Sequence, residues 1–573
     1  MLLFCAASLS SPNDSELYDR VVSGTTLSRM KHDGLATQDA YGGFSPIYTS
    51  PGCAIRWAAS RASNASDTTC HRLDNGSILL CHGRPQLVFG DLPLTAEQLL
   101  SLFRDHPSDG LALLRGHFAI VYVDYPLRRL MCARSHLGRY SLYYHMSGGA
   151  ISIASQLGQL LAAHSGTPMA LDEYIPDYLA MSEHGLLDTT PYRYIFRVVP
   201  GTSITFRPGH AATKQDLPPL TIEQDTPLDR DCQVSRLRQT LIDSTTDLVA
   251  PYDNVVLHLS GGRDSSTLAF ILSQIRRERR GFAVSAETWW YPGLGDERIF
   301  ARSVAARHHI PLREVRIDPN FFSHLVNRER QSEPRMGVPR SYKQSADSVR
   351  DNCSSEKAHP YTYVEGIGGD HLLVLPRLVS NSPVRKSADY WKLAPIPSFW
   401  CVLLEKVAKR LDLRSRLASR LPAPSFSEPS RQLQLWQLLM AEAWGGERDT
   451  LATHRLYPFV DQAVVETCLG FPTECLVADR HPRPMLHDAF AAEWPNTVRE
   501  RFRKGETSRS VCEAAEQHWQ SILALCHNSV LASMGYTNQS TLIDYLSRIL
   551  IFGAGDVPGA LRFLELEAWL QEV

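Results

Sequence analysis

The sequence lacks several patterns that would assign it to a familiar class at once. Its 12 cysteines are scattered singly, with no CxxC pair and no Cys/His cluster at zinc spacing, which argues against a structural metal site and a disulfide framework. No stretch approaches the roughly 18 apolar residues of a membrane helix, and the apolar start MLLFCAASLSS has no basic region. We therefore expect a cytoplasmic protein with reduced thiols and no membrane partner.

An excess of charge of one sign is also missing. The 59 lysines and arginines nearly offset the 61 aspartates and glutamates, so we expect no nucleic-acid partner. The chain contains no Gly-Lys pair, which excludes a Walker A phosphate loop. What the sequence does have is length: 573 residues with 43% hydrophobic content are enough for two or three domains with real cores.

The distribution of strand and helix patterns divides the chain into two domains. Residues 1–207 contain short β-prone runs, among them SILLCHG (77–83) and PQLVFG (85–90), joined by glycine or polar turns, with few helical patterns. Residues 208–229 are polar and proline-rich, as expected of a linker. Residues 230–573 alternate strand and helix patterns at first and are mostly helical beyond residue 385. This order predicts an α/β protein in which a β-rich α+β domain precedes a doubly wound parallel sheet with many C-terminal helices.

The stretch VVLHLSGGRDSST (255–267) ends an apolar strand in two glycines and then begins an amphipathic helix around Ser265. The glycines let backbone N–H groups converge, and the helix start adds its positive dipole end, so the pattern indicates a phosphate site. Asp264 cannot lie beside a polyphosphate without a cation between them, which implies Mg²⁺. The alternative is an ordinary strand-to-helix turn in which Asp264 caps the helix.

A second stretch repeats the device. In YTYVEGIGGDHLL (361–373) a β-prone run leads into Gly366, Gly368, Gly369 and Asp370. Because the preceding strands and helices alternate, this loop is expected at the carboxyl end of a strand in the same sheet.

These motifs resemble those of known enzymes. SGGRDSS is similar to the SGGxDSS signature of the PP-loop ATP pyrophosphatases, which cut ATP between the α and β phosphates and leave AMP on a substrate oxygen. The second loop resembles the GxGxD loop of the asparagine synthetase branch, which implies that Asp264 and Asp370 share a Mg²⁺ ion. WPNTVRERFRKGET (494–507) resembles the segment that brings a lysine to the phosphates, which implies catalytic roles for Lys504 and Arg501. The residues implied to contact ATP are Leu259, Ser260, Gly261, Gly262, Asp264, Ser265, Ser266, Gly366, Gly368 and Gly369.

The first domain also carries a resemblance. RGHFAIVYVDYPLRRLMCARSHLGRYSLYYH (115–145) looks like the core of the Ntn-type glutaminase domain of this branch. Such a glutaminase needs a cysteine immediately after the initiator Met, whereas this chain has Leu2 and its first thiol is Cys5. We therefore expect a domain without glutaminase activity, so that the attacking amine comes from the substrate.

Two families share that arrangement, the β-lactam synthetases and the lasso peptide cyclases. The β-lactam branch places tyrosine, and the asparagine branch glutamate, three residues before the second-loop aspartate, where this chain has Ile367. The resemblance therefore favours a lasso cyclase, which adenylates an Asp or Glu side chain of a core peptide for attack by the peptide's N-terminal amine. It implies a precursor peptide, a leader peptidase and a leader-recognition protein as partners. A small-molecule ligase of the β-lactam or asparagine type stays open; a tRNA-modifying PP-loop enzyme and a non-catalytic scaffold fit less well.

Aromatic and histidine pairs near the first loop have two interpretations. Trp289 and Trp290 either line the adenine or peptide site or pack in the core, and core packing is the commoner role. His308 and His309 fall at the expected end of a helix, where solvated histidines complement the helix dipole.

Overall fold

In the computed structural model, the chain forms two compact units. The described residues are 48–50, 53–55, 68–88, 90, 93–106, 109–137, 140–147, 150–164, 166–180, 188–207, 210–222, 229–290, 296–316, 322, 333–334, 361–374, 431, 434–435, 438, 453–476, 483–501, 508–553 and 557–573. The first unit comprises Met1–Ile175, Gly185–Thr221 and Gly445–His454, and the second comprises Pro176–His184, Ile222–Trp444 and Arg455–Val573. No helix among these residues is both long and apolar enough to cross a bilayer.

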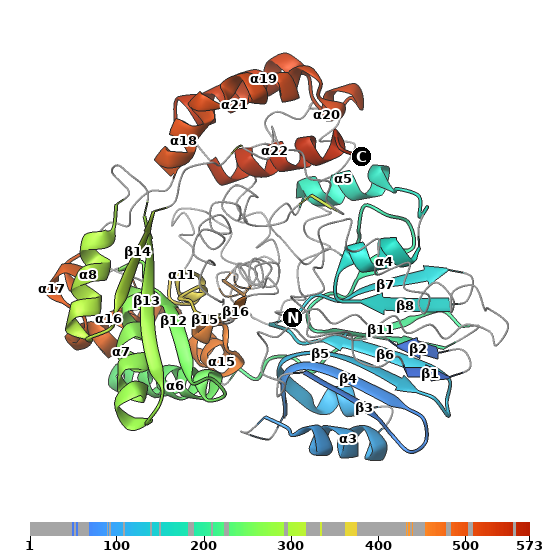
Figure 1. Ribbon diagram of the computed structural model, residues 1–573, viewed down its shortest axis with the longest axis horizontal. Coiled ribbons are helices and arrows are strands. Elements are labelled where there is room, and N and C mark those ends of the chain that lie inside the picture. Colours follow the sequence, from blue (N-terminus) through green and yellow to red (C-terminus); the bar gives the residue numbers. More distant parts are fainter. Residues whose placement is uncertain are drawn as a thin grey trace. The chain divides into compact units, whose positions relative to one another are not determined.

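The first unit is built on a six-stranded antiparallel sheet (Figure 1). Its strands, in spatial order, are β11 (Thr213–Asp216), β10 (Thr202–Phe206), β6 (Arg129–Arg134), β5 (Leu114–Asp124), β4 (Ile78–Leu87) and β3 (Thr68–Arg72). Alternate residues of the central strands face two buried clusters. Leu80 and Val121 pack with Ile153 of β8, whereas Leu79 packs with Phe103 of α3. Both faces of the sheet are therefore covered, which explains why β5 is buried along almost its whole length.

The remaining elements of this part of the chain are short. The strands are β1 (Tyr48–Ser50), β2 (Cys53–Ile55), β7 (Tyr143–Ser147), β8 (Ala150–Ala154) and β9 (Ile195–Arg197), and the helices are α3 (Ala96–Asp105), η2 (Gly110–Leu113), α4 (Leu157–Ala163) and α5 (Leu171–Ala180). α3 begins at Ala96 because Thr95 and Gln98 form a reciprocal capping box.

Two β-prone runs that we expected as separate strands form the single strand β4. Gly83, between them, has φ of +108°, and a Cβ at this position would lie 2.2 Å from the backbone oxygen of His117. Pro85 follows without interrupting the sheet and lies opposite Gly116 of β5. The expectation of separate strands was wrong because this glycine permits a close approach between strands rather than a turn.

Part of the expected linker is also sheet. Thr213–Asp216 form the edge strand β11, paired antiparallel with β10. All four β11 residues are exposed. Because no apolar residue alternates with polar ones here, the hydrophobic pattern could not predict this strand.

The second unit contains a five-stranded sheet whose order is β14-β13-β12-β15-β16 (Figure 1). Its strands are β12 (Asn254–His258), β13 (Ala283–Trp290), β14 (Leu312–Arg316), β15 (Tyr361–Val364) and β16 (Thr453–Leu456), and the pairs β12–β13, β13–β14 and β12–β15 are parallel. α6 (Arg230–Val249) precedes β12, and the helices between the strands are α7 (Arg263–Glu278), α8 (Arg298–Arg307) and α11 (Gly369–Leu372). The predicted alternation and parallel sheet are confirmed.

The C-terminal part of the second unit is helical, as expected. Its elements are η5 (Pro458–Val460), α15 (Gln462–Gly470), η6 (Thr473–Leu476), α16 (Pro484–Phe490), η7 (Ala491–Glu493), α17 (Asn496–Arg499), α18 (Ser508–Gln517), α19 (Trp519–His527), α20 (Val530–Ser533), α21 (Gln539–Leu546), the π-helix η8 (Ser547–Ile551) and α22 (Val557–Leu570). The last helix, α22, carries a buried charged residue. Glu567 is fully buried and accepts hydrogen bonds from the Ser529 hydroxyl and the Val530 N–H at the start of α20.

The expectation of a solvated His308 was wrong. This residue ends α8 and is only 4% exposed. Arg276 of α7 donates to the backbone oxygens of His308 and His309, which ties the end of α8 to α7. Burial, followed by the positive charge of Arg307, lowers the pKa of His308 to about 4. The imidazole is therefore neutral at physiological pH.

We expect His308→Asn to reduce the loss of stability on acidification. The folded pKa of about 4 lies below the ordinary value of 6.5, so the unfolded chain binds more protons between these values. The stability contributed by neutral His308 is fully present above about pH 6.5 and is lost as the pH falls toward 4. The loss amounts to about 2 kcal/mol at about pH 5.

Thermal midpoints of wild type and His308→Asn at about pH 7.5 and about pH 5 test this expectation. His309→Asn is the control, because His309 is exposed and its φ of +52° is one that asparagine tolerates. An identical pH dependence in all three proteins would contradict it.

Candidate functional site

The two glycine loops meet at one edge of the parallel sheet. β12 and β15 are neighbouring parallel strands, with Val256 opposite Tyr363 and Leu257 opposite Val364, so their carboxyl ends lie side by side. The strand order also reverses here, because β12 has β13 on one side and β15 on the other. Ligands of open α/β sheets bind at such a switch point, outside the carboxyl ends of the strands.

Glycines in the second loop allow it to lie against Asp264. A Cβ on Gly366 would lie 3.0 Å from the Asp264 Cβ, and a Cβ on Gly369 would lie 2.6 Å from the Asp264 Cγ. Gly368 has φ of +99°, and a Cβ there would lie 2.6 Å from Cγ2 of Val460. A larger residue at Gly366 or Gly369 would force the loops apart or displace the carboxylate, and one at Gly368 would clash with Val460 of η5.

The first loop leads directly into α7. Gly261 has φ of +69°, and Gly262 is the N-cap residue. The helix begins at Arg263, two residues before the expected start at Ser265. Asp264 therefore lies inside the first turn. The alternative in which the Asp264 side chain caps α7 was wrong, because the N-cap residue is Gly262.

The loop hydroxyls bond within the loop itself. The Ser260 hydroxyl lies 3.2 Å from the Ser265 hydroxyl and accepts from the Gly262 N–H at 3.3 Å. The Ser265 and Ser266 hydroxyls donate to the Gly262 carbonyl at 3.2 Å and 2.7 Å, and the preceding Leu259 is buried. In this arrangement the hydroxyls shape the turn, while the positive end of α7 is the feature suited to phosphate.

One arginine joins the two expected metal ligands. Nη1 of Arg483 donates to Oδ1 of Asp264 at 2.7 Å, and Nη2 pairs with Oδ1 of Asp370. The side chains of Arg483 and Asp264 are about one-tenth exposed, whereas that of Asp370 is half exposed. Carboxylates from two separate motifs thus lie within reach of one cation. Arg483 was not among the residues expected from the sequence, because it lies between two prolines in HPRP and no spacing pattern marks it.

The donor set fits a magnesium-bound nucleotide. Mg²⁺ commonly takes one or two protein carboxylates and completes its shell with phosphates and water. Asp264 and Asp370 supply two carboxylates around a single positive charge. No group of three or more His, Cys, Asp or Glu side chains that would hold a metal occurs among the described residues. The pair therefore suits an ion shared with substrate rather than a closed structural site.

The segment expected to carry the catalytic lysine begins beside the first loop. Arg501 donates to the Gly261 carbonyl at 3.2 Å, pairs with Glu297 and lies over the Phe300 ring at 4.1 Å. Burial lowers the pKa of this guanidinium. These contacts give Arg501 a role in holding the loop against α8. Lys504 itself lies outside the described residues, as do Leu2 and Cys5.

The tryptophans at the end of β13 are partly buried. The Trp289 ring lies 4.4 Å from that of His258, the last residue of β12, and the Arg298 guanidinium lies 3.5 Å from the Trp290 ring centroid. These contacts are packing interactions at the carboxyl edge of the sheet, in line with the commoner of the two roles considered.

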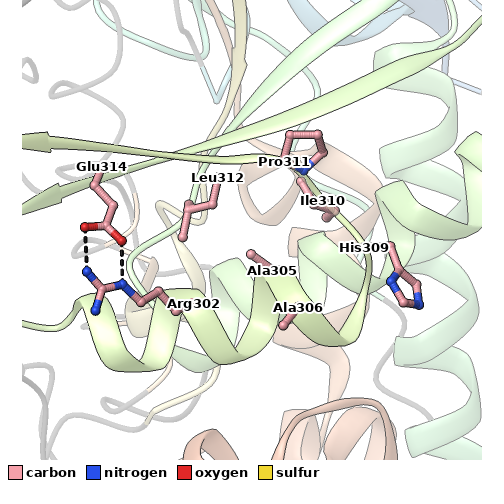
Figure 2. A pocket seen from close by; sticks show the side chains of 8 residues that line it. All are labelled: Arg302, Ala305, Ala306, His309, Ile310, Pro311, Leu312 and Glu314. Carbon is pink, nitrogen blue, oxygen red and sulfur yellow. Dashed lines mark hydrogen bonds and ion pairs between the residues drawn. The ribbon is translucent and has the colours of Figure 1, made fainter.

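A separate pocket of about 430 Å³ lies between α8 and β14 (Figure 2). Figure 2 shows Arg302 donating to both carboxylate oxygens of Glu314. The lining residues are Arg302, Ala305, Ala306, His309, Ile310, Pro311, Leu312 and Glu314. None of them belongs to either glycine loop, so this pocket is not part of the candidate site.

Family models match two parts of the chain. A glutamine amidotransferase domain matches residues 95–216, and an asparagine synthase domain matches residues 236–329, which include the first glycine loop. Together they support an asparagine-synthetase-like superfamily, in which an Ntn-type glutamine-amidotransferase-like domain precedes an asparagine synthase domain.

Two curated fungal proteins are similar to part of the chain. "Amidase chyE" of Penicillium rubens is 25% identical over 187 residues, and "Amidase chry2" of Gibberella zeae is 24% identical over 188 residues; each match covers 32% of this chain and 27% of the relative. The match therefore spans about a quarter of the length of these relatives. A solved glutamine phosphoribosylpyrophosphate amidotransferase from B. subtilis, complexed with ADP and GMP, has 12% identity and a TM-score of 0.21, over 56% of this chain and 64% of its own, and carries no argument.

Proposed function

We propose that this chain is an ATP-dependent, AMP-forming ligase that closes a macrolactam ring in a peptide, as lasso peptide cyclases do. The observation that carries the ligase part is the meeting of two glycine loops, whose Asp264 and Asp370 both pair with Arg483. The asparagine synthase family match supports the same reaction class.

In the first half of the proposed reaction, an Asp or Glu side-chain carboxylate of the peptide attacks the α-phosphorus of ATP, and pyrophosphate leaves. The first turn of α7 and the adjacent glycines orient the phosphates. Asp264 and Asp370 would hold a Mg²⁺ ion, which would neutralise phosphate charge when bound. Lys504 stabilises the charge that develops on the leaving pyrophosphate. Arg501 holds the first loop in place through the Gly261 carbonyl.

In the second half, the N-terminal amine of the peptide attacks the acyl carbon, and AMP leaves. This step depends on position, because the protein must hold the amine beside the acyl group and exclude water. Ile367 is an aliphatic residue between two loop glycines, so it takes no proton from the amine. That feature supports a lasso-type cyclase over the β-lactam and asparagine types, which place a polar residue there.

The finer proposal includes partners. The substrate is a precursor peptide, and a leader peptidase must release the attacking amine before ring closure. A leader-recognition protein would deliver the precursor. These partners rest on the resemblance of the sequence motifs.

A small-molecule ligase is the second candidate. It is favoured by the asparagine synthase match and by the amidase names of the two partial relatives. Such an enzyme would share the ATP chemistry but respond to a free amino acid or a β-amino acid.

ATP–pyrophosphate exchange tests the proposal. We expect a candidate core peptide to stimulate exchange. Asp264→Ala should lower the rate by about 10²–10³-fold, because the Mg²⁺ ion that would neutralise phosphate charge loses one of its two carboxylate ligands. Asp253→Ala is the matched control: Asp253 precedes the same strand and its side chain is 88% exposed.

Exchange stimulated by aspartate or a β-amino acid and not by any peptide would replace the cyclase with the small-molecule ligase. Equal rates in wild type and Asp264→Ala would remove the site itself.

A further inference from the structure

Arg483 stands at the point where the two halves of the site meet. Its two terminal nitrogens contact one oxygen each of Asp264 and Asp370, so a single guanidinium spans both carboxylates. It belongs to neither glycine motif and precedes α16, which places a third segment of the chain at the switch point of the sheet.

The backbone at Arg483 is held in an unusual conformation. Its φ of 62° and ψ of 63° are left-handed, and Pro484 follows immediately. Residues other than glycine rarely adopt these angles, and a following proline disfavours helical angles further. Met485 and Leu486 in the next turn are fully buried, which fixes the chain in this position. The strain falls on a residue that contacts both aspartates.

A guanidinium and a divalent cation cannot both occupy the space between the same carboxylate oxygens. The carboxylates that fit Mg²⁺ are the ones that Arg483 contacts. A metal ion that takes the Oδ1 atoms of both aspartates would therefore have to displace the guanidinium.

We propose that Arg483 competes with the divalent cation for Asp264 and Asp370, so that the metal ion binds well only when nucleotide phosphates accept the displaced guanidinium. This inference deepens the proposed function and rests on it for the identity of the nucleotide. Its consequence is a coupling between the two ligands: phosphate near the first loop provides a new partner for Arg483, and the metal ion then takes the carboxylates.

The coupling gives Arg483 a positioning role with a definite sign. Without the guanidinium, the two carboxylates would lose a cation that both of them contact, and a divalent cation would relieve their mutual repulsion. Removing the arginine should therefore strengthen the binding of metal alone, whereas a purely structural arginine would have no such effect.

Mn²⁺ titration of the full chain without nucleotide, followed by electron paramagnetic resonance, tests this. We expect weak binding to wild type and about tenfold or tighter binding to Arg483→Met. Arg483→Lys, which keeps a charge but cannot form two parallel contacts, should fall between them. The double variant Asp264→Asn/Arg483→Met should lose the gain, which separates the site from adventitious metal binding.

The control is Arg230→Gln. Arg230 pairs with Asp488 of the same helix α16, and both side chains are partly exposed, so this change removes an arginine contact to α16 away from the glycine loops. We expect its Mn²⁺ affinity to equal that of wild type. Far-ultraviolet circular dichroism and the thermal midpoint establish whether each variant is folded. If Arg483→Met does not fold, the Mn²⁺ affinity of Arg483→Lys tests the competition.

Equal Mn²⁺ affinity in wild type and a folded Arg483 variant would overturn the inference, as would tight binding to wild type in the absence of nucleotide. The outcomes for the two proposals are distinguishable. Unchanged Mn²⁺ affinity together with peptide-stimulated exchange removes only the competition. Increased affinity without any exchange removes only the ligase activity.

Discussion

Breaking the buried ion pair between Glu365 and Arg455 is expected to lower the free energy of unfolding of the second unit by about 3–5 kcal/mol. The two side chains are 3% and 5% exposed, and they pair between the end of β15 and β16. The Glu365 N–H also donates to the Leu456 carbonyl, and the Arg455 guanidinium lies 5.6 Å from the Tyr363 ring centroid. Glu365→Leu would leave the arginine charge buried without its carboxylate, which accounts for the size of the effect.

Chemical denaturation of the single and double variants measures this. Arg455→Met should cost a similar amount, whereas Glu365→Leu/Arg455→Met should recover most of the loss, because a buried ion pair contributes little net stability over apolar residues of similar size. Asp105→Asn is the surface control: its pair with Arg104 has side chains 57% and 68% exposed, so the change should cost less than about 1 kcal/mol. A loss below that level in Glu365→Leu would show that water compensates the pair.

Gly261→Ala is expected to lower ATP–pyrophosphate exchange by about a hundredfold or more. Gly261 has φ of +69°, and a Cβ there would lie 2.5 Å from the Phe300 Cβ and 2.7 Å from the Ala301 nitrogen. The backbone of α8 cannot yield as a flexible side chain would. The first loop must therefore shift, and the hydrogen bond that the Gly261 carbonyl accepts from Arg501 shifts with it.

Gly281→Ala separates the clash from the backbone strain. Gly281 has φ of +87° but nothing within 4 Å of an added Cβ. Both variants should lose about 1 kcal/mol of stability from the positive φ, and exchange should fall only in Gly261→Ala. Equal exchange rates in the two variants would mean that the packing of the first loop against α8 does not position the phosphates.

The two metal-ligand candidates show how far sequence reasoning extends. Asp264 and Asp370 each follow a β-prone run that ends in glycines, and strands alternating with helices form parallel sheets with loops at one edge. Local pattern and general topology were therefore enough to expect both loops at one edge of the sheet, and the family resemblance implied that the two acids lie together. Their shared contact with Arg483 agrees with that expectation, while their metal ligation remains a prediction.

Residues that act through long-range packing were not accessible in the same way. Glu365 reads as one more residue before a glycine loop, yet it is buried against Arg455, from a strand far along the chain. His308 reads as a solvated helix end, but α7 covers it through Arg276. β11 has four exposed residues and no apolar periodicity, and it forms by pairing with β10. In each case the deciding partner is distant in sequence.

The sequence by itself determined the class of fold, the order of strands and helices in the second unit, and the two loops suited to phosphate and metal, because apolar periodicity and glycine placement act over a few residues. Only the tertiary structure decided that Arg483 bridges the two aspartates, that Arg501 packs on α8 and that Glu365 pairs with Arg455. Those contacts join segments brought together by the burial of the whole sheet, and no local pattern encodes which charges then meet.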